Sequence, residues 1–191
     1  MKTILKLACE IREHVNDPGN NVFKEKYFNN KTSEWNLLCC SMDTFQDTAL
    51  ALRYYETINL HWKKVGKNIL IFYGILQAIF LQQDAVKNLH KIFLNEKLEI
   101  HKMPNLNKIR NFRNKFTGHP LECKQDKTIY RSIIAPMTLS NHKNIILGSW
   151  DDTNKKAGYE TIDFKEIYKE YKQETKSILK KIIETMKKNW P

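Results

Sequence analysis

The chain has 191 residues, enough for one domain with a substantial core, and its 41% hydrophobic content excludes a generally disordered protein. The net charge of +11 is uneven: residues 61–120 hold 11 Lys or Arg and 3 Asp or Glu, giving +8, against −1 for residues 1–60 and +4 for residues 121–191. The middle third therefore suits a phosphate-binding surface, although a solvated lysine-rich face gives the same count.

Several features of the sequence indicate where in the cell the protein is expected to act. The segment Met1–Val15 is interrupted by charged residues and does not look like a signal peptide. The longest apolar run, Ile69–Leu81, is too short to span a bilayer. No Cys-x-x-Cys spacing occurs among the cysteines, which are Cys9, Cys39, Cys40 and Cys123. We therefore expect a soluble cytoplasmic protein with reduced thiols, no cofactor and no membrane partner.

Three helices are predicted in the first third of the chain. Apolar residues at helical spacing mark a helix over residues 2–15, which the turn-forming sequence Asp17–Asn20 ends. A short helix is expected over residues 22–28. The third helix, capped by Thr32 or Ser33, extends to about Leu60.

Two carboxylates, Asp43 and Asp47, lie one turn apart on this third helix. Such a pair can bind a metal, but we favour an exposed acidic edge or a partner for lysines. The histidines show no His-x-x-x-His spacing, and the glycines form no phosphate-binding loop. We therefore expect no metal centre.

A long central helix is predicted from Lys67 to about Lys97, and its first half has no consistent polar face, as is typical of a helix surrounded by others. Tyr73, Gln77 and Asp84 lie within about 40° of one another on it. If they are buried they need hydrogen-bond partners, and Arg113 is the candidate for Asp84. Alternatively, the solvent-facing half of the helix begins at Asp84 and the two glutamines before it.

A short amphipathic helix follows, with Asn105 as its predicted N-terminal cap. Lys108 and Lys115 fall on one side of it, where we expect water, and both should matter little for activity. The opposite, apolar face consists of Leu106, Ile109, Phe112 and Phe116.

The end of this helix carries the most informative residues. Arg113 lies about 40° from Ile109, inside the apolar arc, where a guanidinium is costly unless it is paired. Gly118 is expected to end the helix in a left-handed conformation. His119 precedes Pro120, which favours an extended backbone at the histidine. The imidazole is thus fixed just past a helix end, close to an inward-facing arginine.

The remainder of the chain changes from helical to β-forming patterns and back. Short strands are predicted over Thr128–Ala135, Asn144–Trp150 and Tyr159–Ile162. Asp163 then caps a last helix, whose apolar stripe consists of Phe164, Ile167, Tyr168, Tyr171, Thr175, Ile178, Ile182 and Met186. The fold class we expect is all-α. It is a single domain over residues 1–191, an antiparallel helical bundle with a long central helix and a β-hairpin or three-stranded insertion at about residues 121–162.

Arg113, Asn114 and His119, with five residues between the arginine and the histidine, resemble the motif of the HEPN (higher eukaryotes and prokaryotes nucleotide-binding) domain. Its ribonuclease members carry an Arg, often followed by Asn, and a His four to six residues after the Arg. The resemblance covers the motif and the helical body, but not the insertion at 121–162.

The resemblance implies a metal-independent endoribonuclease. RNA carries its own nucleophile, the 2′-hydroxyl, so cleavage needs a proton-transfer group, which would be His119, and a cation on the phosphate, which would be Arg113. Asn114 would orient the reacting groups or contact the phosphate. Arg110 is a further candidate for substrate binding, and Asp84, Gln77 and Tyr73 would support Arg113.

The family's pattern also implies partners and a biological role. Its members usually dimerise so that two motifs face one cleft, and toxins and antiphage effectors among them are held in check by an antitoxin or another regulatory protein. We accordingly expect RNA, a second copy of the chain and a controlling protein as partners. Two alternatives remain: a non-catalytic module that binds nucleotide, RNA or a partner protein, and a structural helical dimer.

Overall fold

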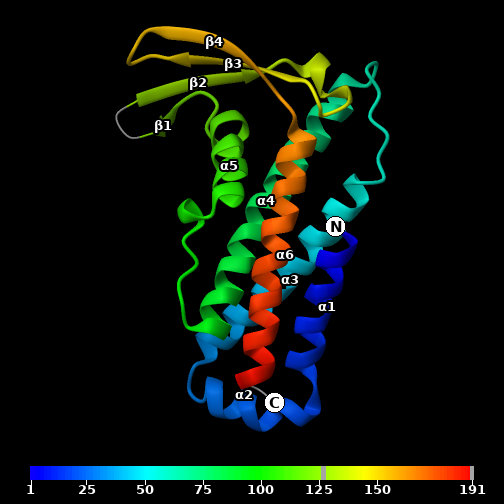
Figure 1. Ribbon diagram of the computed structural model, residues 1–191, viewed down its shortest axis with the longest axis vertical. Helices are drawn as coiled ribbons and strands as arrows, with labels where there is room; N and C mark the ends of the chain where they lie inside the picture. Colours follow the sequence, from blue (N-terminus) through cyan, green and yellow to red (C-terminus); the bar gives the residue numbers. More distant parts are fainter. Residues whose placement is uncertain (126–127, 190–191) are drawn as a thin grey trace.

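The computed structural model describes residues 1–125 and 128–189, with the backbone alone described at Phe23 and Gln125. The helices of an elongated bundle occupy most of it (Figure 1). They are α1 (Lys2–Asn16), α2 (Asn21–Phe28), α3 (Thr32–Tyr55), α4 (Val65–Leu94), α5 (Pro104–Arg113) and α6 (Phe164–Asn189). The third helix therefore ends five residues before the predicted Leu60.

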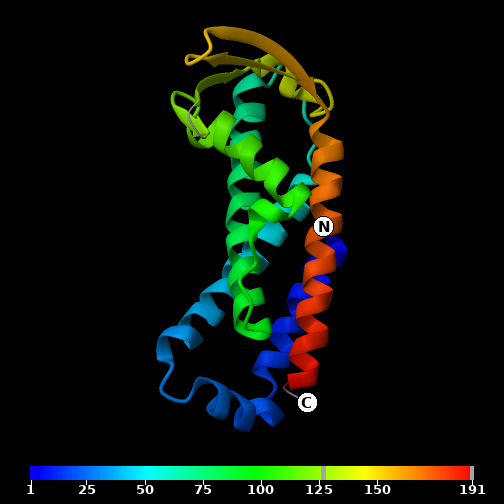
Figure 2. The same cartoon turned by 60° about the vertical axis from the view of Figure 1, so that its left-hand side comes forward.

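A sheet covers the end of the bundle from which α6 descends (Figures 1 and 2). It is an antiparallel meander in the order β1-β2-β3-β4, made of β1 (Cys123–Gln125), β2 (Thr128–Ile134), β3 (Ile145–Asp151) and β4 (Lys156–Ile162). The expected hairpin or three-stranded insertion is therefore four-stranded, and the protein is mostly helical rather than all-α. The strand that was not predicted, β1, is too short to show an alternating pattern.

The core lies between α4 and the helices α3 and α6, and a buried polar chain links the three. The Tyr171 hydroxyl of α6 donates to Gln82 Oε1 at 2.6 Å, and Gln82 Nε2 donates to Thr48 Oγ1 of α3 at 3.3 Å. Gln83 Nε2 donates to the Leu106 carbonyl of α5 at 2.9 Å. The solvent-facing half of α4 therefore does not begin at these glutamines, both of which are buried.

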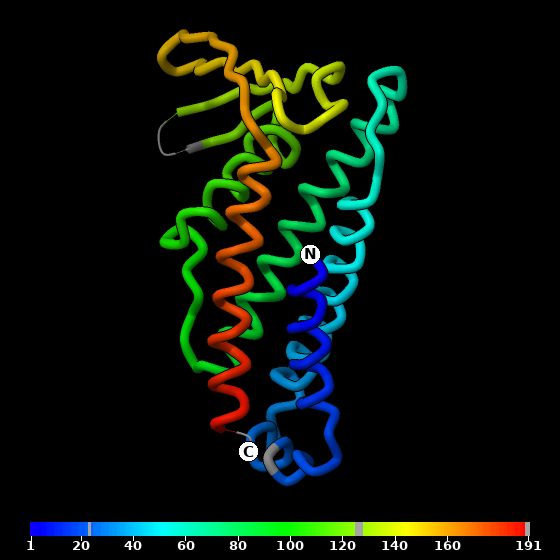
Figure 3. The backbone as a smooth tube through the Cα atoms, turned by 45° about the vertical axis from the view of Figure 1, so that its right-hand side comes forward, coloured from blue at the N-terminus to red at the C-terminus, as the bar shows by residue number. Residues whose placement is uncertain are grey.

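The apolar stripes predicted on α5 and α6 are confirmed, because all of their residues are buried. Asp163 also caps α6 as predicted, its Oδ1 accepting from the Glu166 N–H at 3.1 Å. Figure 3 shows α1 beside the C-terminal half of α6, and the ion pair of Lys187 with Glu10 at 2.7 Å joins the two helices. Asp43 and Asp47 are both exposed, as expected of an acidic edge, and the partner of Asp43 is Arg12 of α1 rather than a lysine.

One side of α4 is not covered by other helices, contrary to the prediction of a helix surrounded by neighbours. Leu70, Tyr73, Gln77 and Leu81 form an exposed stripe along it. Within the described residues, α4 is the one helix long and apolar enough to cross a membrane by length and composition, and half of its most apolar window is buried in the bundle. A core helix of a bundle has these same properties.

Candidate active site at the end of α5

The N-terminus of α5 is anchored by a carboxylate from another helix. The backbone N–H groups of Asn105 and Leu106 donate to Glu174 Oε2 of α6 at 2.9 and 2.7 Å. The helix begins at Pro104, so the predicted capping role of Asn105 is wrong. A negative charge at a helix N-terminus satisfies free N–H groups and interacts favourably with the helix dipole, so Glu174 fixes α5 against α6.

At its other end α5 continues into a π-helical turn, Asn114–Gly118, rather than stopping at a left-handed glycine. The His119 N–H donates to the Asn114 carbonyl at 2.8 Å, and the Thr117 hydroxyl donates to the Arg113 carbonyl at 3.0 Å. His119 has φ −137° and ψ 55°, so its backbone is not fully extended as predicted. π-Helical turns are rare and often occur at functional sites.

Gly118 is required by a close approach rather than by its backbone angles. A Cβ atom at this position would lie 2.6 Å from Arg113 Nη1 and 3.1 Å from Arg113 Cζ. The guanidinium therefore lies against the backbone of the π turn. This backbone is that of the residue directly before His119, which is exposed.

Arg113 is held by neutral groups. Its Nη2 donates to Gln77 Oε1 at 2.8 Å, its Nη1 donates to Asn114 Oδ1 at 3.1 Å, and its Cζ lies 4.1 Å from the centroid of the Phe80 ring. Within the part of the chain that the structure describes, no carboxylate lies within salt-bridge distance of it. Burial lowers the pKa of Arg113, and the charge of neighbouring Arg110 lowers it further, while Asp84 acts in the opposite sense.

The predicted pairing of Asp84 with Arg113 is wrong, because Arg110 takes that carboxylate. Both Nη atoms of Arg110 donate to Asp84 Oδ1 at 3.0 Å, and its Cζ lies 4.2 Å from the Phe80 ring centroid. Helices α4 and α5 run antiparallel here. Arg110 therefore contacts Asp84, and Arg113, further along α5, contacts Gln77, which lies earlier in α4. The Asp84 side chain is 40% exposed, and an ion pair of this kind contributes about 1 kcal/mol or less.

His119 lies on the surface, and no described group forms a hydrogen bond with its ring. The next residue, Pro120, accepts a hydrogen bond from the Ser132 N–H of β2 at 2.7 Å, which fixes the chain beyond the motif to the sheet. Tyr73, expected to support Arg113, is 49% exposed and has no hydrogen-bond partner among the described residues.

Lys108 of α5 and Lys115 of the π turn, both predicted to face water, differ in their exposure. Lys108 is exposed as predicted and pairs with Glu170 of α6 at 2.9 Å. Lys115, in contrast, is mostly buried beneath the sheet, with its Nζ 5.2 Å from the Tyr130 ring centroid and 3.8 Å from Glu160. The expectation of a solvated Lys115 is therefore wrong, because the sheet covers a helix face that the sequence leaves open.

A polar groove of about 360 Å³ runs beside the motif. It is lined by Lys87 of α4, by residues 97–101 of the following loop, and by Asn107, Arg110, Asn111 and Asn114. Its acid, Glu99, pairs with Lys102. Asn107 and Asn111 have no side-chain partner among the described residues, and with Asn114 they follow the helical spacing i, i+4, i+7. That spacing is visible in the sequence, but only the fold shows that a groove lies over it.

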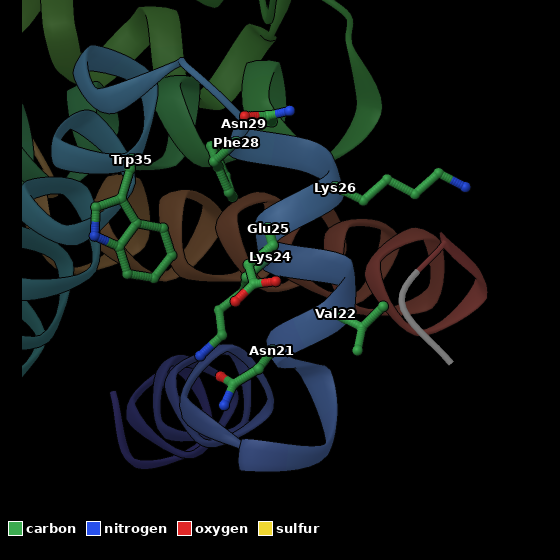
Figure 4. Close-up of a pocket in the computed structure, with 8 residues that line it drawn as sticks. All are labelled: Asn21, Val22, Lys24, Glu25, Lys26, Phe28, Asn29 and Trp35. Atoms are coloured by element: carbon green, nitrogen blue, oxygen red, sulfur yellow. The ribbon is translucent and has the colours of Figure 1, made fainter.

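A larger hollow of about 730 Å³ lies at the opposite end of the bundle, around α2. Figure 4 shows that its side chains do not converge on one point: Val22 and Lys26 point away from Trp35, whereas Lys24 extends on the Trp35 side, with its Nζ 5.9 Å from the Trp35 ring centroid. Without converging polar groups, this hollow does not resemble a catalytic site.

Comparisons with family models, curated proteins and solved structures find no match to this chain. Among the described residues there is also no group of three or more His, Cys, Asp or Glu side chains placed to hold a metal ion. The candidate site therefore consists of Arg113, Asn114 and His119, with Gln77, Phe80 and Arg110 around them.

Proposed function

We propose that this chain is a metal-independent endoribonuclease of the HEPN type that acts in the cytoplasm. The observation that supports this most strongly is the state of Arg113: a partly desolvated guanidinium, fixed by Gln77, Asn114 and Phe80, with no carboxylate partner among the described residues, and packed against the glycine that precedes an exposed histidine. A cation arranged in this way is prepared for an anion from outside the protein, such as a phosphate.

The proposed reaction uses the nucleophile that RNA carries. The 2′-oxygen attacks the adjacent phosphorus, the bond from phosphorus to the 5′-oxygen breaks, and the products are a 2′,3′-cyclic phosphate and a 5′-hydroxyl. The 2′-hydroxyl loses one proton and the leaving 5′-oxygen gains one, and His119 takes part in this transfer. Arg113 stabilises the charge on the non-bridging phosphate oxygens, with Asn114 orienting the guanidinium.

The groove beside the motif supplies a path for the flanking strand. Lys87 and Lys97 provide positive charge for phosphates, while Asn107 and Asn111 carry amides that have no partner among the described residues and can both donate to and accept from base edges. An unpaired RNA strand presents such edges, whereas the deep major groove of an RNA duplex hides them. Single-stranded RNA is therefore the proposed substrate.

A ribonuclease of this kind must be controlled in the cell that makes it. In this proposal the protein is a toxin or an antiphage effector, it assembles as a homodimer, and an antitoxin or another regulatory protein restrains it. The exposed position of His119 supports such control, because a partner that covers this surface would block the histidine directly.

The products of cleavage test the reaction. The protein should cut an end-labelled single-stranded RNA in the presence of EDTA, leave DNA of the same sequence intact, and produce 2′,3′-cyclic phosphate ends, because the nucleophile is the 2′-hydroxyl. Cleavage of the DNA, or activity that depends on an added metal ion, would contradict the proposal. Salt-dependent RNA binding without cleavage would instead favour a non-catalytic binding module.

A further inference from the structure

The strand β4 leaves one edge of the sheet unpaired. It pairs with β3 on one side, and six of its seven residues are exposed. Figures 1 and 2 place β4 at one end of the long axis of the molecule, with no other described helix or strand beyond it. An open edge of this length presents a row of free N–H and C=O groups that can pair with another strand.

We propose that β4 pairs in antiparallel orientation with β4 of a second copy of this chain, about a twofold axis at Gly158. This register places Lys156 opposite Glu160 of the second copy, and the symmetry repeats the pair on the other side of the axis. Within its own chain Lys156 lies opposite Asp151 of β3 and Glu160 lies 3.8 Å from Lys115, but the Glu160 side chain remains 55% exposed. No other symmetric register of this strand brings the two opposite charges together. Opposite charges placed directly across a strand pair stabilise it, and like charges destabilise it.

The outer face of the sheet fits the same register. Within one chain, Ile133, Gly148 and Tyr159 lie in one row across β2, β3 and β4, and Trp150 and Ala157 lie in a neighbouring row. In the pair, Tyr159 lies opposite Ala157 of the second copy, next to that copy's Trp150. Tyr159 is 76% exposed and Trp150 37%, and the small Ala157 leaves room for the tyrosine ring.

In this dimer the inner faces of the two sheets lie on the same side of the joined sheet. A twofold axis perpendicular to the sheet keeps its two faces distinct, so both π turns, which pack under the sheet through Lys115 and Tyr130, lie on the same side of a continuous eight-stranded sheet. This assembly does not depend on the proposed ribonuclease activity, because it rests on the strand edge alone.

Charge reversal tests the interface. Sedimentation velocity over a concentration series should show a reversible dimer for the wild type. Lys156→Glu places two carboxylates opposite each other on both sides of the axis and should weaken dimerisation roughly tenfold or more. It also places a carboxylate opposite Asp151 within the chain, an effect that the rescue variant retains and so separates from the interface. Combining Lys156→Glu with Glu160→Lys restores opposite charges across the axis. Because Lys115 lies 3.8 Å from Glu160 in the same chain, this rescue is made in a Lys115→Gln background and should recover the dissociation constant of the Lys115→Gln protein. Lys143→Glu, an exposed position outside the strand, is the matched control and should dimerise like the wild type.

Circular dichroism establishes that each variant is folded before its association is measured. A wild type that remains monomeric throughout the series would overturn the proposal. So would a dimer that Lys156→Glu leaves intact, or one that the rescue variant fails to restore. A monomeric wild type would also contradict the homodimer of the proposed function, but none of these outcomes bears on the cleavage reaction, which is measured separately.

Discussion

Two guanidinium groups share one aromatic ring in the candidate site, and their environments differ. Arg110 and Arg113 both lie about 4 Å from the centroid of Phe80, but among the described residues only Arg110 pairs with a carboxylate, that of Asp84. The favourable contact with the ring and the bonds to neutral amides hold Arg113 in place without neutralising it. A bound phosphate would supply the missing negative charge.

A substitution at Gly118 tests whether the position of the Arg113 guanidinium matters for cleavage. Gly118→Ala adds a Cβ where Arg113 Nη1 now lies, so the guanidinium must move, and small displacements of a catalytic group are costly. We expect the cleavage rate to fall by roughly ten- to a hundredfold. The free energy of unfolding should change by about 1 kcal/mol or less, because the clashing atoms are at the end of a flexible, partly exposed side chain.

Gly74→Ala on α4 is the matched control for that substitution. No atom lies within 4 Å of a Cβ at this exposed helical position. It should leave cleavage unchanged and raise the free energy of unfolding by about 0.5–1 kcal/mol. Wild-type cleavage by Gly118→Ala would show that the position of the guanidinium does not matter.

At the scale of elements, the loop before β3 joins the sheet to the bundle through a buried histidine. His142 is fully buried, its Nδ1 lies 2.7 Å from the Tyr55 hydroxyl, and its ring packs against Phe72 and Phe164. Burial, and to a smaller extent the charge of Lys165, lowers the pKa of His142 to about 4. The folded protein therefore holds a neutral imidazole.

This pKa predicts a loss of stability in mild acid. The unfolded chain binds a proton at His142 near the ordinary value of 6.5, and the folded chain only near 4, so the stabilisation is complete above pH 6.5 and falls as the pH decreases from there to about 4. Between pH 7 and pH 5 the contribution lost is about 2 kcal/mol.

Urea denaturation of the wild type and His142→Asn at both pH values isolates this contribution, because the other titrating groups are common to the two proteins. Asparagine also tolerates the positive φ of 55° at this position. The wild type should lose more free energy of unfolding than the variant. Equal losses in the two proteins would mean that the protonation of His142 does not change on unfolding in this pH range.

The elements themselves were largely predictable, because long amphipathic helices carry strong periodic signals. The inward orientation of Arg113 follows from helical rotation, and so does the buried face of α5. The partner of Arg113 does not, since the spacing within one helix cannot fix its register against another. For the same reason the sequence did not show that Glu174 caps α5 or that the sheet covers Lys115.

At the scale of the whole molecule, the positive charge, the groove and the motif lie together. The middle third of the chain, which carries most of the excess charge, contributes α4, α5 and the loop between them, and these line the groove. The four-stranded sheet lies over the π turn and leaves β4 open at the end of the molecule. The site and the proposed interface are thus separate parts of the same end of the fold.

The central claim is that His119 performs chemistry, and one comparison tests it most directly. His119→Ala and His61→Ala, a substitution of another exposed histidine in the loop between α3 and α4, are purified identically with the wild type and incubated with one end-labelled RNA. We expect His119→Ala to abolish cleavage while its RNA affinity stays within about twofold of the wild type, because proton transfer acts on the transition state. His61→Ala should cleave like the wild type. Equal cleavage by all three proteins would contradict the account.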